Sequence, residues 1–416
     1  MKPLKILILS YRSAPFGGGQ GIYVKELSES LANLGHHVEV FSGPPYPQLN
    51  QNIKIIKSEG LNLFETFNFR DRLSKLFKKQ KKTLEDYYEF FSVLAGGFPE
   101  MKTFGSRAEK YVTNMDYDIV IDNQSLSYGI LNIQNKFPLI EVIHHPITKD
   151  LEHELETNNG LIYRFSRKRW YSFLKMQKAV APEISFILSP SLSSKKDISK
   201  DFDVDLKNIT VIQNAIDTNI FKPYPDNTRM PYRIITTASA DVPLKGLDYS
   251  IYAISKIQKK IKDIELVVIG SPRAGGHTER LIKKLKLEDK IKFITNLTKE
   301  EIAIEYSKSS VAIVSSLYEG FGYPVAEAMS CQIPLIATNI SSIPEITGEY
   351  ATLIEPRSAK MIEDSLNDIF LNYEKHQQIA IKGREHIIRN LSWQTIGKKY
   401  QDLIKIVINN HNTKKC

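Results

Sequence analysis

The chain has 416 residues, of which 42% are hydrophobic and 25% charged, and its formal net charge at pH 7 is +9. This length allows two domains with separate cores, and the composition excludes a disordered or fibrous protein. No apolar run approaches a membrane span, and the run at 6–9 is too short for a signal peptide. Two cysteines provide no disulfide framework and no metal site, so we expect a reducing, cytoplasmic location. The positive charge favours acidic partners such as nucleotide diphosphates or anionic lipid.

The first segment predicts a β–loop–α–β unit with a glycine-rich loop after its first strand. The glycines, Gly18 and Gly19 among them, do not follow the G-x-G-x-x-G spacing of a dinucleotide site. Such a loop is either a simple tight turn or a place where the backbone approaches a ligand closely. The expected elements are a strand at 5–11, the loop at 12–21, a helix at 22–34 and a strand at 37–42.

Two basic and aromatic runs follow. The stretch 67–82 carries apolar residues at helical spacing among seven lysines and arginines. It fits either a membrane-surface helix that reaches anionic head groups or a solvated basic face over an ordinary core stripe. The run 163–178 predicts a helix with Trp170, Phe173 and Leu174 packed inward. Neither run matches a nucleic-acid-binding motif, so we expect no nucleic-acid partner.

The rest of the first half predicts further strands of the same sheet. His144 and His145 end the strand expected at 138–144, where a histidine can be structural or can face a substrate. Pro225 and Pro231 predict a linker at 224–232. The other elements expected here are strands at 118–123, 186–191 and 209–214 and a helix at 193–200.

A second alternating series of strands and helices predicts a second parallel sheet. Lys245 and Gly246 end the loop after its first strand, and a lysine there can reach a diphosphate or can simply be solvated. The expected elements are strands at 233–239, 265–270, 291–295, 311–316, 334–338 and 351–356, and helices at 247–261, 278–286, 298–308, 325–331, 360–373 and 375–389.

The stretch 311–344 is the most informative part of the sequence. A tight loop, Tyr318 to Gly322, leaves a strand and enters a helix that begins at Pro324. Open α/β sheets bind anionic ligands at such a place, because free N–H groups and the helix dipole point at the ligand. Glu319 could hold a sugar ring. Glu327, expected in the first helical turn, could bind a ribose or could simply favour the helix start.

The wording EGFGYPVAEAMSCQIPLIAT resembles the E-x7-E signature of retaining glycosyltransferases of family 4. Three further passages resemble the family: the glycine-rich loop, the passage NAID with FKP near 214–223, and LSW at 391–393. The resemblance implies the GT-B fold, in which two doubly wound Rossmann-like domains face each other across a cleft that closes on the substrates. It places an acceptor-side domain at 1–215, with a C-terminal helix at 392–416 that ends near Ile408 and packs back on it, and a nucleotide-sugar-binding domain at 216–391.

The resemblance also implies a reaction: metal-independent transfer from a nucleotide-diphosphate sugar to a sugar or lipid-linked acceptor, in cell-surface polysaccharide or glycolipid synthesis. Glu319 would position the sugar, and His144 or His145 would line the reacting cleft, with the P-x5-H spacing favouring His144. The donor would also contact Lys245, Glu327 and the loop residues Gly18, Gly19, Gly320, Phe321 and Gly322. The protein would work in the cytoplasm or on the inner face of the membrane, which 67–82 would contact.

Several positions depart from the family pattern. Ala240 stands where an arginine is usual, and Arg273 is a candidate substitute. Gln332 and the pair Ser341-Ser342 replace usual glycines. The D-x-D runs at 116–118 and 203–205 are poor metal candidates, since neither lies at a strand end of the second series. The alternatives to a transferase are another enzyme of the same fold and a non-catalytic sugar-nucleotide-binding or scaffold protein.

Overall fold

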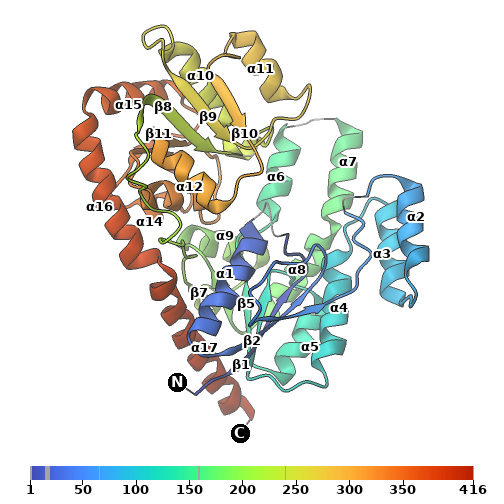
Figure 1. Ribbon diagram of the computed structural model, residues 1–416. Coiled ribbons are helices and arrows are strands. Elements are labelled where there is room, and N and C mark those ends of the chain that lie inside the picture. Colours follow the sequence, from blue (N-terminus) through green and yellow to red (C-terminus); the bar gives the residue numbers. More distant parts are fainter. Residues whose placement is uncertain (1, 15–18, 65, 158–159, 239, 416) are drawn as a thin grey trace. The chain divides into compact units, whose positions relative to one another are not determined.

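The computed structural model describes residues 2–14, 19–64, 66–157, 160–238 and 240–415. The chain divides into two compact units. Unit 1 comprises Met1–Ile212 and Gly397–Cys416, and unit 2 comprises Gln213–Ile396. Each unit is built on its own parallel sheet, so the prediction of two doubly wound α/β domains is confirmed (Figure 1).

Unit 1 contains, in its described residues, a seven-stranded sheet in the order β3-β2-β1-β4-β5-β6-β7. The apolar β-branched runs of the sequence form its central strands, which are buried on both faces, as parallel sheets require. The strand order reverses between β1 and β4, so the loops after these strands flank the point where open sheets bind ligands. The strands are β1 (Lys5–Ser10), β2 (His37–Ser42), β3 (Lys54–Lys57), β4 (Ile119–Asn123), β5 (Leu139–Val142), β6 (Ile187–Ser189) and β7 (Ile209–Val211).

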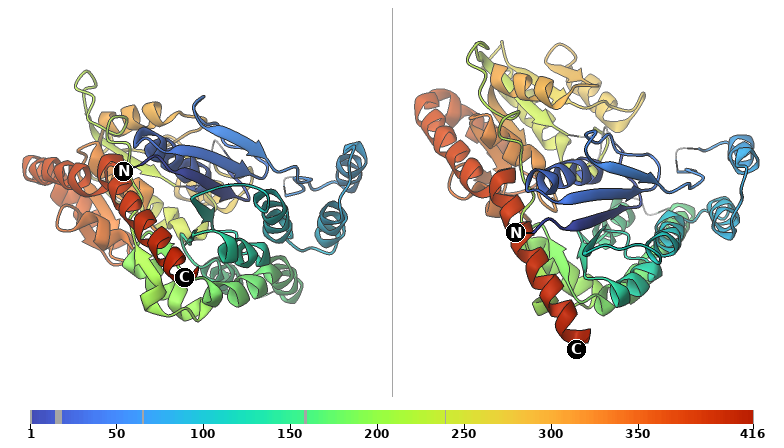
Figure 2. Two further views of the ribbon diagram at one scale, coloured as in Figure 1. Left: turned by 90° about the horizontal axis from the view of Figure 1, so that it is seen from below. Right: turned by 60° about the horizontal axis from the view of Figure 1, so that its bottom comes forward.

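The helices of unit 1 cover this sheet, except for a hairpin of α2 and α3 that projects from it in both views of Figure 2. Helix α17 (Trp393–Lys415) adds a buried stripe of Tyr400, Leu403, Ile404 and Val407 to this unit, and the hydroxyls of Tyr400 and Tyr23 are hydrogen-bonded. The other helices are α1 (Gly19–Asn33), α2 (Phe69–Lys78), α3 (Leu84–Leu94), α4 (Glu100–Val112), α5 (Tyr128–Lys136), α6 (Thr148–Thr157), α7 (Leu161–Trp170), α8 (Leu174–Val180) and α9 (Leu192–Phe202).

Unit 2 contains, in its described residues, a six-stranded sheet in the order β10-β9-β8-β11-β12-β13. Here the order reverses between β8 and β11. The strands are β8 (Met230–Thr237), β9 (Glu265–Ile269), β10 (Ile291–Ile294), β11 (Ser309–Val314), β12 (Leu335–Thr338) and β13 (Thr352–Ile354). The helices are α10 (Leu247–Ile257), α11 (His277–Leu285), α12 (Lys299–Lys308), α13 (Tyr323–Ser330), α14 (Ile343–Thr347), α15 (Ala359–Leu371) and α16 (Tyr373–Leu391).

Some local predictions were wrong. Instead of the single helix expected at 163–178, the structure has α7, a 3-10 turn at Tyr171–Phe173 and α8. Of the three residues predicted to pack inward, Leu174 is buried, whereas Trp170 and Phe173 are only partly buried. The linker expected at 224–232 overlaps β8, helix α14 was not predicted, and α17 continues beyond Ile408 because no glycine or proline follows to end it.

Candidate active site

Glu319 and Lys245, predicted from separate stretches of sequence, lie together in unit 2. The Lys245 Nζ is 2.7 Å from Glu319 Oε1, and the Ser316 hydroxyl donates to the same oxygen at 2.7 Å. Glu319 is 8% exposed. Lys245 ends the loop after β8 and Glu319 follows β11, so the pair marks the reversal point of this sheet.

Backbone contacts join these two loops. The Leu317 N–H donates to the Leu244 carbonyl at 2.7 Å, and the Ser315 hydroxyl donates to the Gly246 carbonyl at 2.9 Å. Gly246 has a φ of +60°, and a Cβ placed on it would lie 2.0 Å from the Ser315 carbonyl oxygen. Glycine is therefore required here both by the backbone conformation and by the closeness of the second loop.

Ser342 is a contributor that sequence reasoning missed. Its hydroxyl donates to the Glu319 carbonyl at 3.0 Å and to the Phe321 carbonyl at 2.5 Å, so it stabilises the glycine-containing loop. The sequence comparison treated Ser341-Ser342 only as a loss of two glycines. A buried serine after a strand end was the available signal, since its hydroxyl must find a partner.

Helix α13 begins just after this loop. Gly322, its N-cap, has a φ of +99°, and Pro324 lies in the first turn, where a missing N–H costs nothing. The positive end of the α13 dipole therefore lies beside this loop, although the Val325 N–H already donates to the Gly322 carbonyl at 3.1 Å. Glu327 is the fifth residue of α13, so its expected place in the first turn was wrong, because the helix begins at Tyr323, ahead of the predicted start at Pro324.

Two further predictions concern the loops beside this pair. Ala240 is 7% exposed and belongs to the apolar core of unit 2, so an arginine side chain there would have to leave the core to reach a ligand. Arg273 is exposed, and its backbone N–H donates to Asp241 Oδ2 at 2.7 Å. Its guanidinium remains only a candidate substitute.

The predicted glycines of unit 1 are only partly described. Gly19 is the first residue of α1, whereas Gly18 lies outside the described residues. Gly21 in the same helix packs against the chain at Ala14, since a Cβ placed on it would lie 2.1 Å from the Ala14 carbonyl oxygen. The start of α1 thus needs a small residue for close packing at the end of β1.

His144 lies just beyond β5, held on three sides. The ring Nε2 is 2.8 Å from Asn123 Oδ1, and the backbone N–H of His144 donates to Gln124 Oε1 at 2.9 Å. The ring meets Tyr23 of α1 edge-on, with centroids 4.7 Å apart. Asn123 Nδ2 donates to Ser10 Oγ at 3.2 Å, so its oxygen faces the imidazole and accepts from Nε2–H. This leaves Nδ1 of His144 as a hydrogen-bond acceptor.

His145 points to a different partner. Its Nε2 is 2.9 Å from Asp150 Oδ2, and its carbonyl accepts from Gln124 Nε2 at 2.7 Å. One glutamine therefore fixes the backbone at both histidines. Sequence reasoning missed Asn123 and Gln124, although Asn123 ends the predicted strand 118–123 and Gln124 follows it, where ligand-contacting residues are expected.

Backbone conformation at the end of β4 is unusual. Gln124 and Leu126 have φ values of +60° and +45°. Asp122 Oδ2 accepts from the Ser125 N–H at 2.9 Å and from its hydroxyl at 2.7 Å, which stabilises this turn. Positive φ at such residues costs free energy and recurs at functional sites. We infer that this strained turn is kept because it positions the Gln124 side chain.

Asp122 has a buried acidic neighbour. It pairs in register with Glu141 of β5, and both side chains are fully buried. Burial raises the pKa of Glu141 well above its usual value, and the nearby Asp122 raises it further. Burial raises the pKa of Asp122 as well, while its hydrogen bonds from Ser125 lower it. The sequence could have indicated this pair, because β4 and β5 each contain one acidic residue in an otherwise largely apolar run.

The protonation state of His144 gives a testable pH dependence. Burial lowers its pKa to about 3. Below the unfolded value of about 6.5, the unfolded chain binds a proton that the folded chain does not, so stability falls as the pH drops. We expect wild-type protein to lose about 2 kcal/mol more than His144→Gln between pH 7 and pH 5, measured by urea unfolding.

The control for this prediction is His145→Gln, which removes the neighbouring, partly exposed imidazole. It should retain the pH dependence that the buried His144 confers. Equal losses for wild type and His144→Gln would show that His144 is protonated in the folded state.

The D-x-D runs have structural partners in unit 1. Asp118 Oδ2 accepts from the Lys5 N–H at 2.7 Å, and Asp205 caps a 3-10 turn while pairing with Lys207. Within the described ranges, no cluster of three or more His, Cys, Asp or Glu has a geometry that could hold a metal ion. Nor, in the same ranges, does any helix have the length and apolar character of a membrane span.

Comparison with known proteins gives full-length matches. A family model described as "Glycosyltransferase Family 4" matches residues 17–220, and one described as "Glycosyl transferases group 1" matches 223–386. The MMP alpha-(1->4)-mannosyltransferase of Mycolicibacterium hassiacum is 37% identical over 95% of this chain and 96% of its own.

Solved structures are similar in fold. Sucrose-phosphate synthase from Thermosynechococcus elongatus has a TM-score of 0.75 at 19% identity, covering 98% of this chain and all of its own. HepE from Anabaena, solved in complex with UDP and glucose, has a TM-score of 0.69 at 15% identity, covering 97% and 99%. At these identities the likeness concerns the fold alone.

Proposed function

The chain belongs to glycosyltransferase family 4 and has the GT-B fold, and from that premise we propose that it is a retaining, metal-independent hexosyltransferase. Its donor is a nucleotide-diphosphate sugar and its acceptor carries a sugar. A mannosyl donor is favoured, because the relative that is 37% identical is named as a mannosyltransferase.

The observation that carries the proposal is the Lys245–Glu319 pair at the reversal point of unit 2. A leaving diphosphate needs its developing charge stabilised, and three groups supply this: the N–H groups of Gly320 to Gly322, the α13 dipole and Lys245. When Lys245 turns to the diphosphate, Glu319 is left to accept from two sugar hydroxyls. The ion pair is thus a resting arrangement that the donor exchanges for its own contacts.

In this proposal His144 binds a hydroxyl group of the sugar and does not transfer a proton. Its depressed pKa keeps the imidazole neutral, and its Nδ1 accepts from a hydroxyl while Asn123 holds Nε2–H. In the proposed step the acceptor oxygen attacks the anomeric carbon from the face that the diphosphate leaves. The carbon–oxygen bond to the phosphate breaks, and the departing phosphate oxygen takes the acceptor's proton.

A covalent double displacement is the other route to retention. It requires a carboxylate nucleophile beside a second carboxyl group that acts as acid and base. The side chain of Glu319 contacts Lys245 and Ser316 instead, and neither is the second carboxyl group that this route requires. These contacts favour the same-face attack.

A thermal-shift panel of UDP-, GDP- and ADP-sugars tests the proposal, without metal and then with Mn²⁺. A ligand at about 100 times its Kd stabilises the native state by about 2.7 kcal/mol, so one nucleotide should raise Tm selectively without metal. Lys245→Gln should reduce the shift, and Lys256→Gln, on the exposed face of α10, should not. A shift only with Mn²⁺ would contradict metal independence.

Binding without transfer would instead support the alternative, a non-catalytic sugar-nucleotide-binding protein. Incubation of the selected donor with mannose oligomers separates the two outcomes, because a transferase lengthens them and releases the nucleoside diphosphate. We also propose that the protein contacts an anionic membrane surface through the stretch 67–82.

A further inference from the structure

Helix α3 presents its faces in the reverse of the usual order. A surface helix normally buries apolar residues and exposes charged ones. The inner face of α3 instead carries Asp86 and Glu89, which are buried together with Phe90 and Val93. Its outer face is apolar and aromatic. That outer face consists of Leu84, Tyr87, Tyr88, Phe91 and Leu94, all exposed, with Leu84 85% and Phe91 64% exposed.

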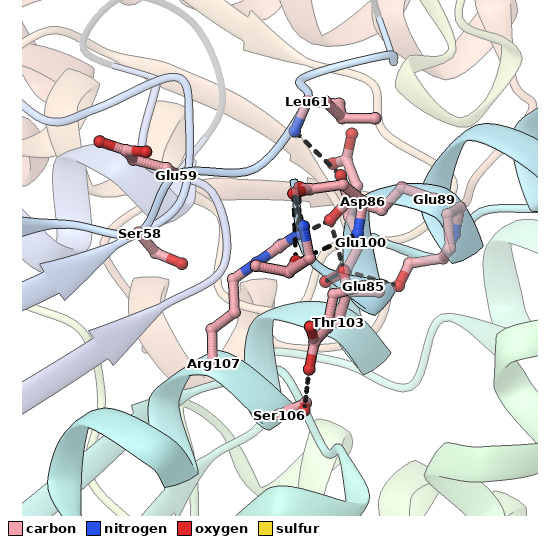
Figure 3. A network of polar contacts seen from close by, with 12 residues as sticks. Ser58, Glu59, Leu61, Glu85, Asp86, Glu89, Glu100, Thr103, Ser106 and Arg107 are labelled. Carbon is pink, nitrogen blue, oxygen red and sulfur yellow. Dashed lines mark hydrogen bonds and ion pairs between the residues drawn. The ribbon is translucent and has the colours of Figure 1, made fainter. Parts of the chain in front are cut away.

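The buried carboxylates are fully engaged, as Figure 3 shows. Asp86 Oδ1 accepts from Arg107 of α4 at 3.0 Å. The same oxygen accepts from Lys79 Nζ at 2.7 Å. Glu89 accepts from Arg107 at 2.5 Å, from the Thr103 hydroxyl at 2.6 Å and from the Leu61 N–H at 2.9 Å. Turning α3 over would carry both carboxylates into solvent and leave the Arg107 side chain, which is 14% exposed, without its partners, which is costly. The polar network therefore fixes the apolar face outward.

The surroundings of this face are basic. Arg70, Lys78, Lys81 and Lys82 are exposed on α2 and just after it. Within the described residues 66–94, Asp71 is the one acidic side chain that is exposed to the same degree. Lys102 of α4 lies over the Tyr88 ring, with its Nζ 4.5 Å from the centroid. An apolar, aromatic surface with a cationic rim is complementary to an anionic partner.

We propose that the outer face of α3 is the surface by which this protein docks on an anionic membrane leaflet. The aromatic rings would lie at head-group depth, and the lysines would reach the lipid phosphates. A second copy of the chain is the other candidate occupant, but it would bring two cationic rims together. The inference extends the proposed membrane contact from the stretch 67–82 to α3. Leu73 and Leu76 of α2 turn inward, whereas Phe69 and Phe77 are exposed and would join the same contact.

Sedimentation of the full chain with phosphatidylcholine vesicles, with and without phosphatidylserine, tests the proposal. Binding should require phosphatidylserine and should fade as salt increases. The double variant Leu84→Ser, Phe91→Ser should bind the vesicles about tenfold more weakly than wild type, because two inserted apolar side chains are lost. Leu371→Ser, at an 83% exposed position on α15, is the matched control and should bind like wild type.

A second pair of variants keeps the test independent of the first. Lys81→Glu with Lys82→Glu should weaken vesicle binding and its salt dependence, whereas Lys196→Glu with Lys200→Glu on α9 should not. The variants should retain the donor-induced Tm shift, so failure here is distinct from failure of the proposed enzyme activity. Absence of vesicle binding at low salt would overturn the proposal. So would a wild-type dimer that the double variant Leu84→Ser, Phe91→Ser makes monomeric, because a second copy would then occupy the face.

Discussion

Replacing Glu319 by glutamine is expected to lower kcat/KM by about 10²- to 10³-fold, the size of effect seen when one group that stabilises a transition state is removed. Glutamine keeps the shape of the side chain but cannot balance Lys245 or accept from two sugar hydroxyls with both oxygens. Lys245 is 30% exposed, so it stays hydrated without its partner, and the fold should lose little stability. Initial rates with the donor identified by thermal shift provide the measurement.

Glu265→Gln is the matched control for this prediction. Glu265 is also a partly buried carboxylate of unit 2, and its Oε2 is 3.1 Å from Arg233 Nε. It begins β9, whereas Glu319 follows the carboxyl end of β11. Ion-pair loss at Glu265 should therefore affect stability and leave kcat/KM near the wild-type value. Equal activity losses in the two variants would show that Glu319 acts only through the stability of unit 2.

The sheets and the principal loops were predictable because their signals are local. Apolar β-branched runs separated by amphipathic stretches determine parallel strands and covering helices, and the loop at 318–322 carries its two glycines in sequence. Glu319 and Lys245 are 74 residues apart, and their direct contact depends on the strand order. The sequence placed each at a strand end, but only the sheet order brings β8 beside β11.

The missed features are those in which a polar residue is buried. Pattern reasoning made no prediction for Asp86 and Glu89, which lie buried because Arg107 and Lys79 neutralise them inside. The same reasoning passed over Asn123 and Gln124, since a short amide is typical of any turn. Their roles arise from hydrogen bonds to a strand that is distant in sequence, which no period in the sequence records.

Replacing Gly246 by alanine is expected to cost about 3 kcal/mol of stability and to abolish the donor-induced Tm shift. A left-handed backbone costs an alanine about 1–2 kcal/mol, and forcing a methyl group against a packed carbonyl adds about 1–3 kcal/mol. The added Cβ would lie 2.0 Å from the Ser315 carbonyl oxygen, so the loops after β8 and β11 must move apart. Chemical denaturation and the thermal shift with donor measure the two effects.

Gly275→Ala separates backbone strain from loop separation. Gly275 has a φ of +66°, close to the +60° of Gly246, but a Cβ placed on it would meet no atom within 4 Å. It should therefore lose only the roughly 1–2 kcal/mol of a left-handed alanine and should keep the donor-induced shift. If both variants keep the shift, the contact between the two loops is not needed for donor binding. If only Gly246→Ala loses the shift, donor binding depends on the distance between Lys245 and Glu319 that the contact between the two loops fixes.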